Sequence, residues 1–220
     1  MRVAFFGSPA WAVPVLKALD EAHPVVLVVT APDRPQGRGL KPAPTPVAEY
    51  ALARGLPVLK PERLKGNRAF LEAFKAAGPE VAITAAYGKI LPKEILEVPP
   101  YGFLNLHPSL LPKYRGAAPV QWALIRGEKT TGVSIMKTEE GLDTGPIYLA
   151  YETPIGPEET ALELSQRLRD KGIELLLEVL SRLPDLTPIP QTGEASYAPP
   201  LTKEEGRIRF DDPAEAIYAR

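Results

Sequence analysis

The amino-acid sequence predicts an α/β fold, a doubly wound and mostly parallel sheet with helices on both faces. The first observation is alternation, because strand-like apolar runs and helix-like segments follow one another from the N-terminus to residue 127. The second is HPVVLVVTA at residues 23–31, a continuous apolar run of the kind found in strands covered on both faces. The third is MRVAFFG at residues 1–7, a β-branched and aromatic run that ends at a glycine.

The individual elements follow from local signals. The strand at residues 1–7 leads into a helix at SPAWAVPVLKALDEA, with Ser8 as its N-cap and Pro9 at its first position. Apolar runs and helical spacing then predict, in order, a helix at 47–54, a strand at 56–61, a helix at 67–77, a strand at 80–87, a strand at 102–107 and a helix at 119–127.

The C-terminal third begins with two expected strands in residues 131–155, joined by an acidic loop that contains glycines. Residues 157–183 predict a long amphipathic helix, whose apolar face we assign to Leu162, Leu168, Leu175, Leu176, Val179 and Leu180. The segment at 184–213 has the Pro, Gly and Ser density of a linker. We therefore expect one domain at 1–190, and at 191–220 a linker and the start of a C-terminal domain that is cut short.

The composition sets limits on function. The chain has 220 residues, 45% of them hydrophobic, and a net charge of −1, so it can bury a full core and has no global attraction to polyanions. The absence of Cys excludes disulfides and thiolate chemistry. No signal peptide or membrane-spanning run is recognised, so we expect a cytoplasmic protein. The 26 Pro and 2 Met are typical of thermophile proteins.

Several chemistries are disfavoured. FFGSPAW lacks the G-x-G-x-x-G spacing that brings a backbone close to a pyrophosphate, so no dinucleotide cofactor is expected. The turn at Gly7 and Ser8 is either an ordinary turn, which we favour, or an anion site. Ser109 lies outside any G-x-S-x-G elbow, and His23 precedes a strand at the opposite edge of the sheet. One His, one Asn and one Asp form a poor ligand set, so no metal is expected.

The strand at 102–107 carries an unusual polar pair. Asn105 and His107 are two residues apart and so share one face, while Leu104 and Leu106 point to the other. Pro108 then ends the strand, and in open α/β sheets ligands bind outside the carboxyl ends of strands. Two hydrogen-bond donors at such a place suit chemistry at a carbonyl oxygen. The alternative, with even odds from the local sequence, is a satisfied strand-end histidine beside a capping asparagine.

Asp143 favours the catalytic alternative. It lies between two glycines in EEGLDTGP, in a loop that we expect to open at the same carboxyl edge of the sheet. A carboxylate beside His107 would fix the tautomer of the ring. The alternative is an aspartate in an Asx-turn before Gly145.

Three segments together closely resemble the formyltransferases that use 10-formyltetrahydrofolate: FLNLHPSLLPKYRGAAPVQWALIRGE, TGVSIMKTEEGLDTGPI and AYGKILP. More narrowly, nearly the whole chain resembles the N-terminal part of the methionyl-tRNA formyltransferases. The resemblance implies a Rossmann-like formyltransferase fold. It also implies a catalytic domain at 1–190, followed in that family by a C-terminal β-barrel that adds a basic surface for tRNA.

The resemblance also implies site residues. The family's catalytic Asn, His and Asp fall on Asn105, His107 and Asp143. Its pocket for the formyl donor falls on Tyr87, Gly88, Lys89, Ile90, Leu91, Ser109, Leu110, Leu111, Pro112, Glu139 and Glu140. Apolar members of this set suit a flat pterin, although for Ile90 and Leu91 plain core packing is an alternative.

The loop PDRPQGRGLKP is a basic finger in an otherwise neutral chain. From its composition alone, a solvated basic loop is the favoured interpretation. The resemblance implies contact with the acceptor arm of initiator tRNA, through Arg34, Gly37, Arg38, Gly39 and Lys41.

The expected reaction is formylation of the methionine on initiator methionyl-tRNA, with 10-formyltetrahydrofolate as donor substrate and no metal or covalent enzyme intermediate. One rival is an enzyme of the same superfamily that formylates an amino group on a nucleotide-linked sugar; glycinamide ribonucleotide transformylase fits less well. Another rival, of a different class, is a non-catalytic folate- or RNA-binding module. No membrane partner is expected, and we favour a monomer.

Overall fold

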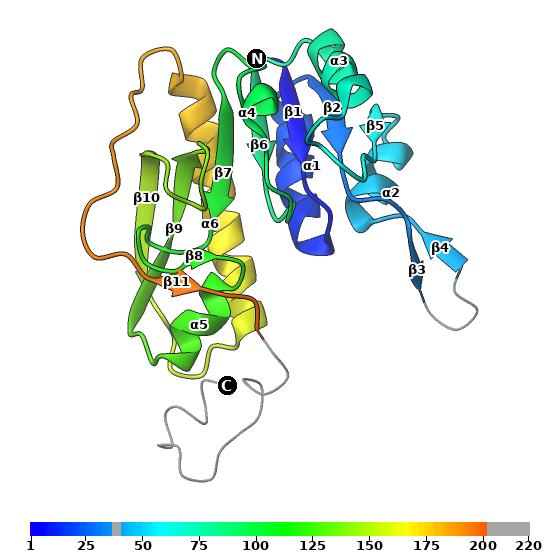
Figure 1. The fold of residues 1–220 in the computed structure, drawn as a ribbon. Coiled ribbons are helices and arrows are strands. Elements are labelled where there is room, and N and C mark those ends of the chain that lie inside the picture. The colour runs from blue at the N-terminus through cyan, green and yellow to red at the C-terminus, as the bar shows by residue number, and fades with distance from the viewer. Residues whose placement is uncertain (37–40, 202–220) are drawn as a thin grey trace.

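A seven-stranded sheet runs through the part of the chain that the computed structural model describes, residues 1–36 and 41–201 (Figure 1). Its strand order is β10-β9-β7-β6-β1-β2-β5. The strands are β1 (Val3–Phe6), β2 (Val25–Val29), β5 (Val58–Leu59), β6 (Val81–Thr84), β7 (Phe103–His107), β9 (Thr130–Lys137) and β10 (Ile147–Pro154). The strands from β7 to β5 are parallel, whereas β9 is antiparallel to β7 and β10 to β9. The predicted mostly parallel sheet is confirmed.

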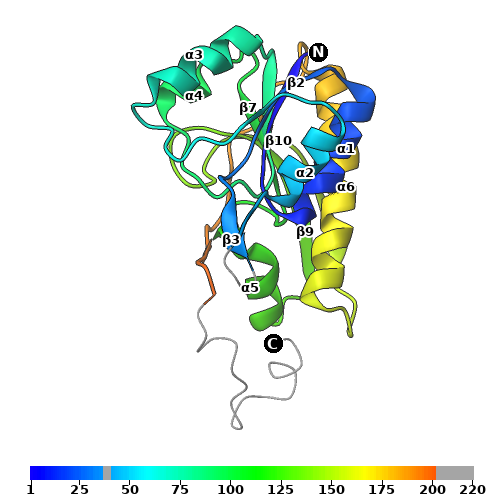
Figure 2. The same ribbon diagram turned by 90° about the vertical axis from the view of Figure 1, so that its right-hand side faces the viewer.

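Helices cover both faces of this sheet, as predicted (Figures 1 and 2). They are α1 (Val13–Ala22), α2 (Pro46–Ala53), α3 (Arg68–Ala77), α4 (Lys93–Leu96), α5 (Pro119–Ile125) and α6 (Ala161–Arg182). Buried side chains of α1, α2 and α6 pack on one face, in a mostly aliphatic core. Those of α3 and α4 pack on the other face, around Phe6, Phe74 and Phe103. No described helix is long and apolar enough to cross a membrane.

The start of the first helix differs from the prediction. A short 3-10 helix, η1 (Ala10–Ala12), precedes α1, and neither has a side-chain cap at its N-terminus. The Ser8 hydroxyl instead accepts hydrogen bonds from the Thr30 hydroxyl at 3.2 Å and from the backbone N–H of Ala31 at 3.0 Å. The cap prediction was wrong because the chain after β2 competes successfully for the same oxygen.

The long helix α6 is confirmed, but Leu162 was wrongly assigned to its buried face, and Leu175 is only partly buried. Leu162 is 66% exposed. The buried stripe consists of Leu164, Leu168, Gly172, Leu176, Val179 and Leu180. A four-residue spacing places Gly172 in this stripe, although glycine gives no signal in a search for apolar side chains.

Four short strands were not predicted from the sequence. β3 (Arg34–Gln36) and β4 (Lys41–Ala43) form an antiparallel pair within the basic finger. β8 (Arg115–Gly116) pairs in parallel with β11 (Tyr197–Ala198), which lies in the segment that the composition predicts to be a linker. Strands this short carry too little periodicity to be found by pattern, and the β8–β11 pair also joins segments that are far apart in the sequence.

Candidate active site

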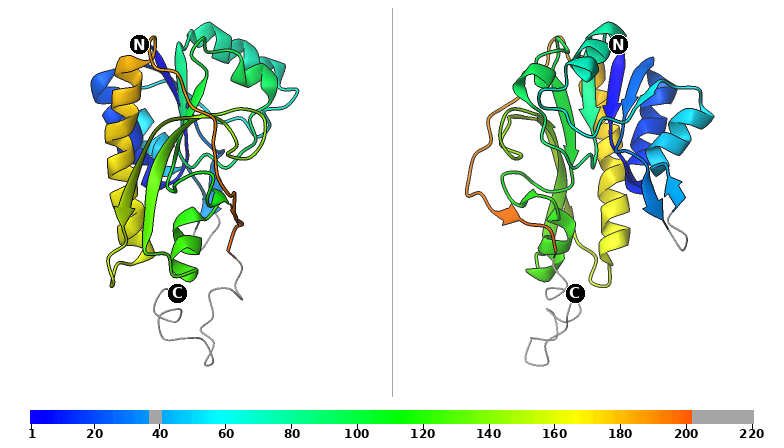
Figure 3. Two further views of the ribbon diagram at one scale, coloured as in Figure 1. Left: turned by 90° about the vertical axis from the view of Figure 1, so that its left-hand side faces the viewer. Right: turned by 45° about the vertical axis from the view of Figure 1, so that its right-hand side comes forward.

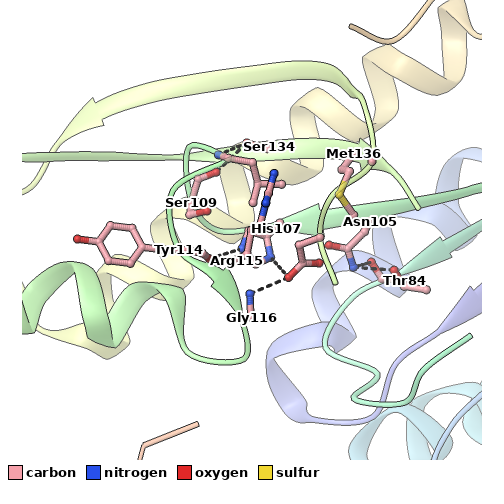
Figure 4. Close-up of polar contacts among 12 residues, drawn as sticks. Thr84, Asn105, His107, Ser109, Tyr114, Arg115, Gly116, Ser134 and Met136 are labelled. Carbon is pink, nitrogen blue, oxygen red and sulfur yellow. Dashed lines mark hydrogen bonds and ion pairs between the residues drawn. The ribbon is translucent and has the colours of Figure 1, made fainter. Parts of the chain in front are cut away.

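The carboxyl end of β7 carries the predicted polar pair, with Asn105 and His107 on one face (Figure 4). Leu104 and Leu106 point to the opposite face and join the core beneath α6. His107 is only 5% exposed, while Asn105 is half-buried. The imidazole is therefore a buried polar group whose hydrogen bonds must come from the protein or a ligand.

One nitrogen of the His107 ring is held by the backbone. Its Nε2 lies 2.8 Å from the carbonyl oxygen of Tyr114. Because a carbonyl oxygen can only accept, Nε2 carries a proton and donates it. The other ring nitrogen, Nδ1, is left outside this bond.

Asp143 lies on the Nδ1 side of this ring. Its Oδ2 is 3.7 Å from His107 Nδ1 and accepts a hydrogen bond of 2.8 Å from the backbone N–H of Gly116 (Figure 4). A separation of 3.7 Å is too long for a direct hydrogen bond, so Nδ1 is not engaged by the carboxylate and can face a ligand. The structure thus brings Asp143 beside His107, as the sequence predicted.

The reason given for this encounter was nevertheless wrong. β9 is antiparallel to β7, and Lys137 at its end pairs with Leu104, away from the carboxyl end of β7. The loop at 138–146 must therefore return toward the site before β10 begins. Asp143 has a positive φ of 54° in this loop, a conformation that Asp tolerates better than most residues.

Thr84 is a neighbour that sequence reasoning missed. The Asn105 amide nitrogen donates to the Thr84 hydroxyl at 2.6 Å, and the Thr84 carbonyl oxygen lies 3.3 Å away. Thr84 ends β6, the parallel neighbour of β7, and pairs directly with Asn105. An amide NH₂ group has two hydrogens, so both have acceptors on Thr84, and the bond of 3.3 Å is the weaker of the two.

The four predicted pocket residues that follow β7 form a tight turn. Ser109 is fully buried, and its hydroxyl donates to the carbonyl oxygen of Lys113 at 2.7 Å, so it contributes to the turn. Pro112 is also buried, whereas Leu110 and Leu111 are half-buried. Apolar contact with a ligand in this segment is therefore available from the two leucines.

The remaining predicted pocket residues fall into two groups. Tyr87, Gly88 and Lys89 line a cavity of about 400 Å³ that is also lined by Arg34 and Thr45 and by none of the residues 109–112. Ile90 is 93% exposed, which argues against core packing at this position, whereas Leu91 packs partly against the aromatic core. Glu139 and Glu140 are exposed on the loop before Asp143.

Two ionisable side chains that line this cavity have pKa values shifted from their usual range. Burial raises the pKa of Tyr87 to about 12. Burial, followed by repulsion from Arg34, lowers the pKa of Lys89, whose ammonium group donates to the carbonyl oxygens of Pro61 and Glu62 at 2.8 Å each. A cation held near another cation makes this cavity suitable for an anionic or carbonyl-rich group.

The predicted tRNA-binding residues are described only in part. Arg34 and Lys41 are exposed, one on each strand of the β3–β4 pair. Gly37, Arg38 and Gly39 lie outside the described residues. Among residues 1–36 and 41–201 no group of three or more His, Asp or Glu side chains could hold a metal ion.

Two further residues near the site were missed from the sequence. The guanidinium group of Arg115 donates to the side-chain oxygen of Gln191 at 2.9 Å, and the amide nitrogen of Gln191 donates to the carbonyl oxygen of Asp143 at 2.8 Å. The identity of Arg115 in a basic turn was a usable signal, but Gln191 lies in a segment whose composition suggests a linker.

Comparison with known proteins identifies the family. The formyl transferase family matches residues 1–180. Over all 220 residues, the chain is 70% identical to a methionyl-tRNA formyltransferase of Thermus thermophilus, and it covers 72% of that protein. This chain belongs to the methionyl-tRNA formyltransferases. A second methionyl-tRNA formyltransferase, from Deinococcus radiodurans, is 54% identical over 220 residues, with 100% of this chain and 69% of the relative covered.

The fold also matches solved formyltransferases. An N-formyltransferase from Helicobacter canadensis, solved with folinic acid and dTDP-3-aminofucose, superposes with a TM-score of 0.72 over 99% of this chain and 78% of its own. The sequences are 20% identical, so this likeness establishes the fold alone. The α/β formyltransferase fold is confirmed, and the thermophile pattern of the composition agrees with the relative from Thermus thermophilus.

Proposed function

We propose that this methionyl-tRNA formyltransferase transfers the formyl group of 10-formyltetrahydrofolate to the α-amino group of methionine on initiator methionyl-tRNA, and so supports translation initiation. The observation that carries the proposal is the convergence of Asn105, His107 and Asp143 at the carboxyl end of β7. The relatives that share the family are methionyl-tRNA formyltransferases by name, one of them at 70% identity. The Helicobacter canadensis enzyme contains folinic acid, a formylated folate, which supports a folate donor.

The reaction requires charge stabilisation at one oxygen. The neutral α-amino nitrogen attacks the formyl carbon, so a C–N bond forms while negative charge develops on the formyl oxygen. The bond from that carbon to N10 of the folate then breaks, the amine loses a proton and N10 gains one. Hydrogen-bond donors fixed in a poorly solvated site are the usual means of stabilising such an oxygen.

The chain's own residues can supply these donors. The Asn105 amide can donate to a ligand by exchanging its longer bond of 3.3 Å, to the carbonyl oxygen of Thr84, and protonated His107 presents Nδ1–H beside Asp143. We assign both groups to the formyl oxygen. Asp143 orients His107 and helps remove the proton of the amine, through water where the distance requires it.

The donor and the acceptor are assigned to different parts of the chain. We assign the pterin to the surroundings of Tyr87–Leu91, Ser109–Pro112 and the loop with Glu139 and Glu140; exposed Ile90 and half-buried Leu110 and Leu111 offer apolar surface. The exposed cations Arg34 and Lys41 of the β3–β4 pair suit the phosphates of the tRNA acceptor arm.

We further propose a domain arrangement and a location. Residues 1–190 make up the body of the catalytic domain, and the described residues that follow pack on it through Gln191 and the β8–β11 pair. Initiator tRNA is aminoacylated and used in the cytoplasm, so we place the protein there. We also propose that it is a monomer.

The test is formyl transfer from 10-formyltetrahydrofolate to methionyl-tRNA, measured beside a nucleotide-linked amino sugar as rival acceptor. His107→Ala should lower kcat by at least about a hundredfold. His23→Ala, which changes the only other histidine of the chain, should retain activity. Transfer to the sugar alone would contradict the proposed acceptor, and transfer to neither would leave a folate-binding module as the better explanation.

A further inference from the structure

Residues 189–199 lie across both loops that form the site, where the orange segment runs beside β10 and β8 (Figures 1 and 3). Ile189 and Ile147 exchange two backbone hydrogen bonds, of 2.7 and 2.8 Å, at the end of the loop that carries Asp143. Farther along, the backbone N–H of Arg115 donates to the carbonyl oxygen of Ser196 at 3.0 Å. The segment thus contacts the loop after β9 and the loop after β7 within a few residues.

Gln191 joins these two loops through its side chain. Its amide nitrogen donates to the carbonyl oxygens of Asp143 and Gly145, both at 2.8 Å. Its amide oxygen accepts from Arg115, at 2.9 Å from Nη2 and 3.3 Å from Nε. Because carbonyl oxygens only accept and a guanidinium group only donates, this network determines which end of the amide is nitrogen.

These contacts complete a closed path around the carboxylate of Asp143. Gln191 holds the Asp143 backbone on one side, and Gly116, the residue after Arg115, donates to Asp143 Oδ2 at 2.8 Å on the other. Arg115 links the two sides by its bond to Gln191. The position of the carboxylate relative to His107 is therefore set by Gln191 together with the backbone of residue 116.

We propose that Gln191 is a positioning residue for the reaction, which holds the Asp143 loop against Arg115 so that the carboxylate faces the His107 ring. The inference rests on the proposed function, because it takes Asp143 to act on the substrate through His107. Glutamine suits this role because it donates two hydrogens to two carbonyl oxygens and accepts from a cation with the same group. A glutamate would keep the contact with Arg115, but its carboxylate has no hydrogen to donate to the two carbonyl oxygens and would repel them.

Gln191→Glu therefore distinguishes two roles of Gln191: positioning the Asp143 loop, and merely anchoring residues 189–199 to Arg115. We expect its kcat for formyl transfer to methionyl-tRNA to fall at least about tenfold, with both KM values within about twofold, because small displacements of a catalytic group are costly. Gln191→Asn keeps the amide but is one methylene shorter, and it should retain more activity than Gln191→Glu. Gln166→Ala is the control, since Gln166 is an exposed glutamine on α6. Wild-type kcat in Gln191→Glu would overturn the inference.

A second arm asks whether Gln191 acts through Asp143. In an Asp143→Asn background the carboxylate is already absent, so adding Gln191→Glu should change the single-turnover rate by less than about twofold. An equal proportional loss in both backgrounds would overturn the inference, because the residue would then act independently of Asp143.

A third arm does not depend on activity. The chain contains two histidines, so the ¹⁵N resonances of both rings can be followed by NMR. Gln191→Glu should shift the His107 ring resonances and leave those of His23 in place, whereas Gln166→Ala should move neither. Unchanged His107 resonances in Gln191→Glu or Gln191→Asn would overturn the inference. If wild-type protein transfers no formyl group to methionyl-tRNA, the proposed function fails, and this arm still decides whether Gln191 positions the site.

Discussion

Two buried tyrosines differ in whether the hydroxyl group has a hydrogen-bond partner. Tyr87 is 8% exposed and packs edge-on against Phe6, but its hydroxyl has no hydrogen-bond partner among the described residues. Tyr114 is 4% exposed, and its hydroxyl donates to Glu128 at 2.7 Å. Burial, with Glu128 as a further cause at Tyr114, raises the pKa of each to about 12. The two residues therefore offer a matched pair for testing the cost of an unsatisfied polar group.

We predict that Tyr87→Phe raises the free energy of unfolding at pH 7 by about 1 kcal/mol, because it removes a buried, unpaired hydroxyl. Tyr114→Phe, the control, should lower it by about 1 kcal/mol, because it removes a satisfied bond. Denaturant unfolding monitored by circular dichroism measures both. A loss of stability in Tyr87→Phe would show that its hydroxyl has a partner in solution.

The same pair predicts the alkaline behaviour. The unfolded chain loses a tyrosine proton near pH 10, whereas the folded chain keeps those of Tyr87 and Tyr114 to about pH 12. The folded state binds more protons in this window, so the free energy of unfolding falls as pH rises from 10 to 12. Either Phe variant should make this fall shallower, and an unchanged slope in denaturant unfolding at pH 10 to 11 would contradict the prediction.

Among the elements, α6 shows how one helix supports the site from the opposite face of the sheet. Its N-terminus has a capping box, in which Thr160 and Glu163 exchange side-chain to backbone hydrogen bonds of 3.1 Å. Near its middle, Gly172 lies directly against Leu106, the residue between Asn105 and His107. The cap and the close approach together fix the position of α6 under β7.

Loss of the cap should be measurable. Thr160→Ala should lower the free energy of unfolding by about 1 kcal/mol, since a backbone N–H at the helix start then loses its acceptor. Thr160→Ser keeps the hydroxyl and should retain most of the stability. Thermal unfolding of the three proteins provides the comparison, and equal stability of the Ala and Ser variants would contradict a role for the cap.

Gly172 should resist replacement although alanine is the better helix former. A Cβ atom at this position would lie 2.8 Å from two carbon atoms of Leu106. Gly172→Ala should therefore lower the free energy of unfolding by about 1–2 kcal/mol, instead of the gain of up to about 1 kcal/mol seen at open helix positions. Leu106→Val in the same chain should recover part of the loss in denaturant unfolding. Additive losses would contradict direct steric contact.

On the scale of the whole molecule, charge is distributed locally. The net charge is −1, yet the β3–β4 pair, at the right-hand edge of the molecule in Figure 1, carries the cations Arg34 and Lys41. A nearly neutral protein gains no long-range attraction to nucleic acid, so tRNA binding must depend on such patches.

The combined variant Arg34→Ala/Lys41→Ala should weaken methionyl-tRNA binding and reduce the slope of log K against log salt by about one for each cation removed. The kcat at saturating tRNA should stay within about twofold. Lys17→Ala/Lys75→Ala, which removes two exposed cations from α1 and α3, is the control. Filter-binding assays across a salt series measure the slopes. Equal slopes for the two double variants would contradict a phosphate-binding role for the β3–β4 pair.

The sequence by itself determined the features that depend on neighbouring residues. Periods of two and of 3.6 residues give the strands and helices, and the period of two places Asn105 and His107 on one face of β7. The acidic, glycine-flanked loop singled out Asp143, and the family resemblance added its catalytic role. These features are predictable because the geometry of a strand or helix is repeated in every protein.

The tertiary structure alone decided which distant residues meet. It set β9 antiparallel to β7, turned the loop of Asp143 back toward His107, and brought Gln191 to Arg115 across 76 residues of sequence. Local patterns encode whether a residue is buried but not its partner. The partner follows from the packing and closure of the whole chain, which is why an apparent linker contributes a hydrogen-bond network to the site.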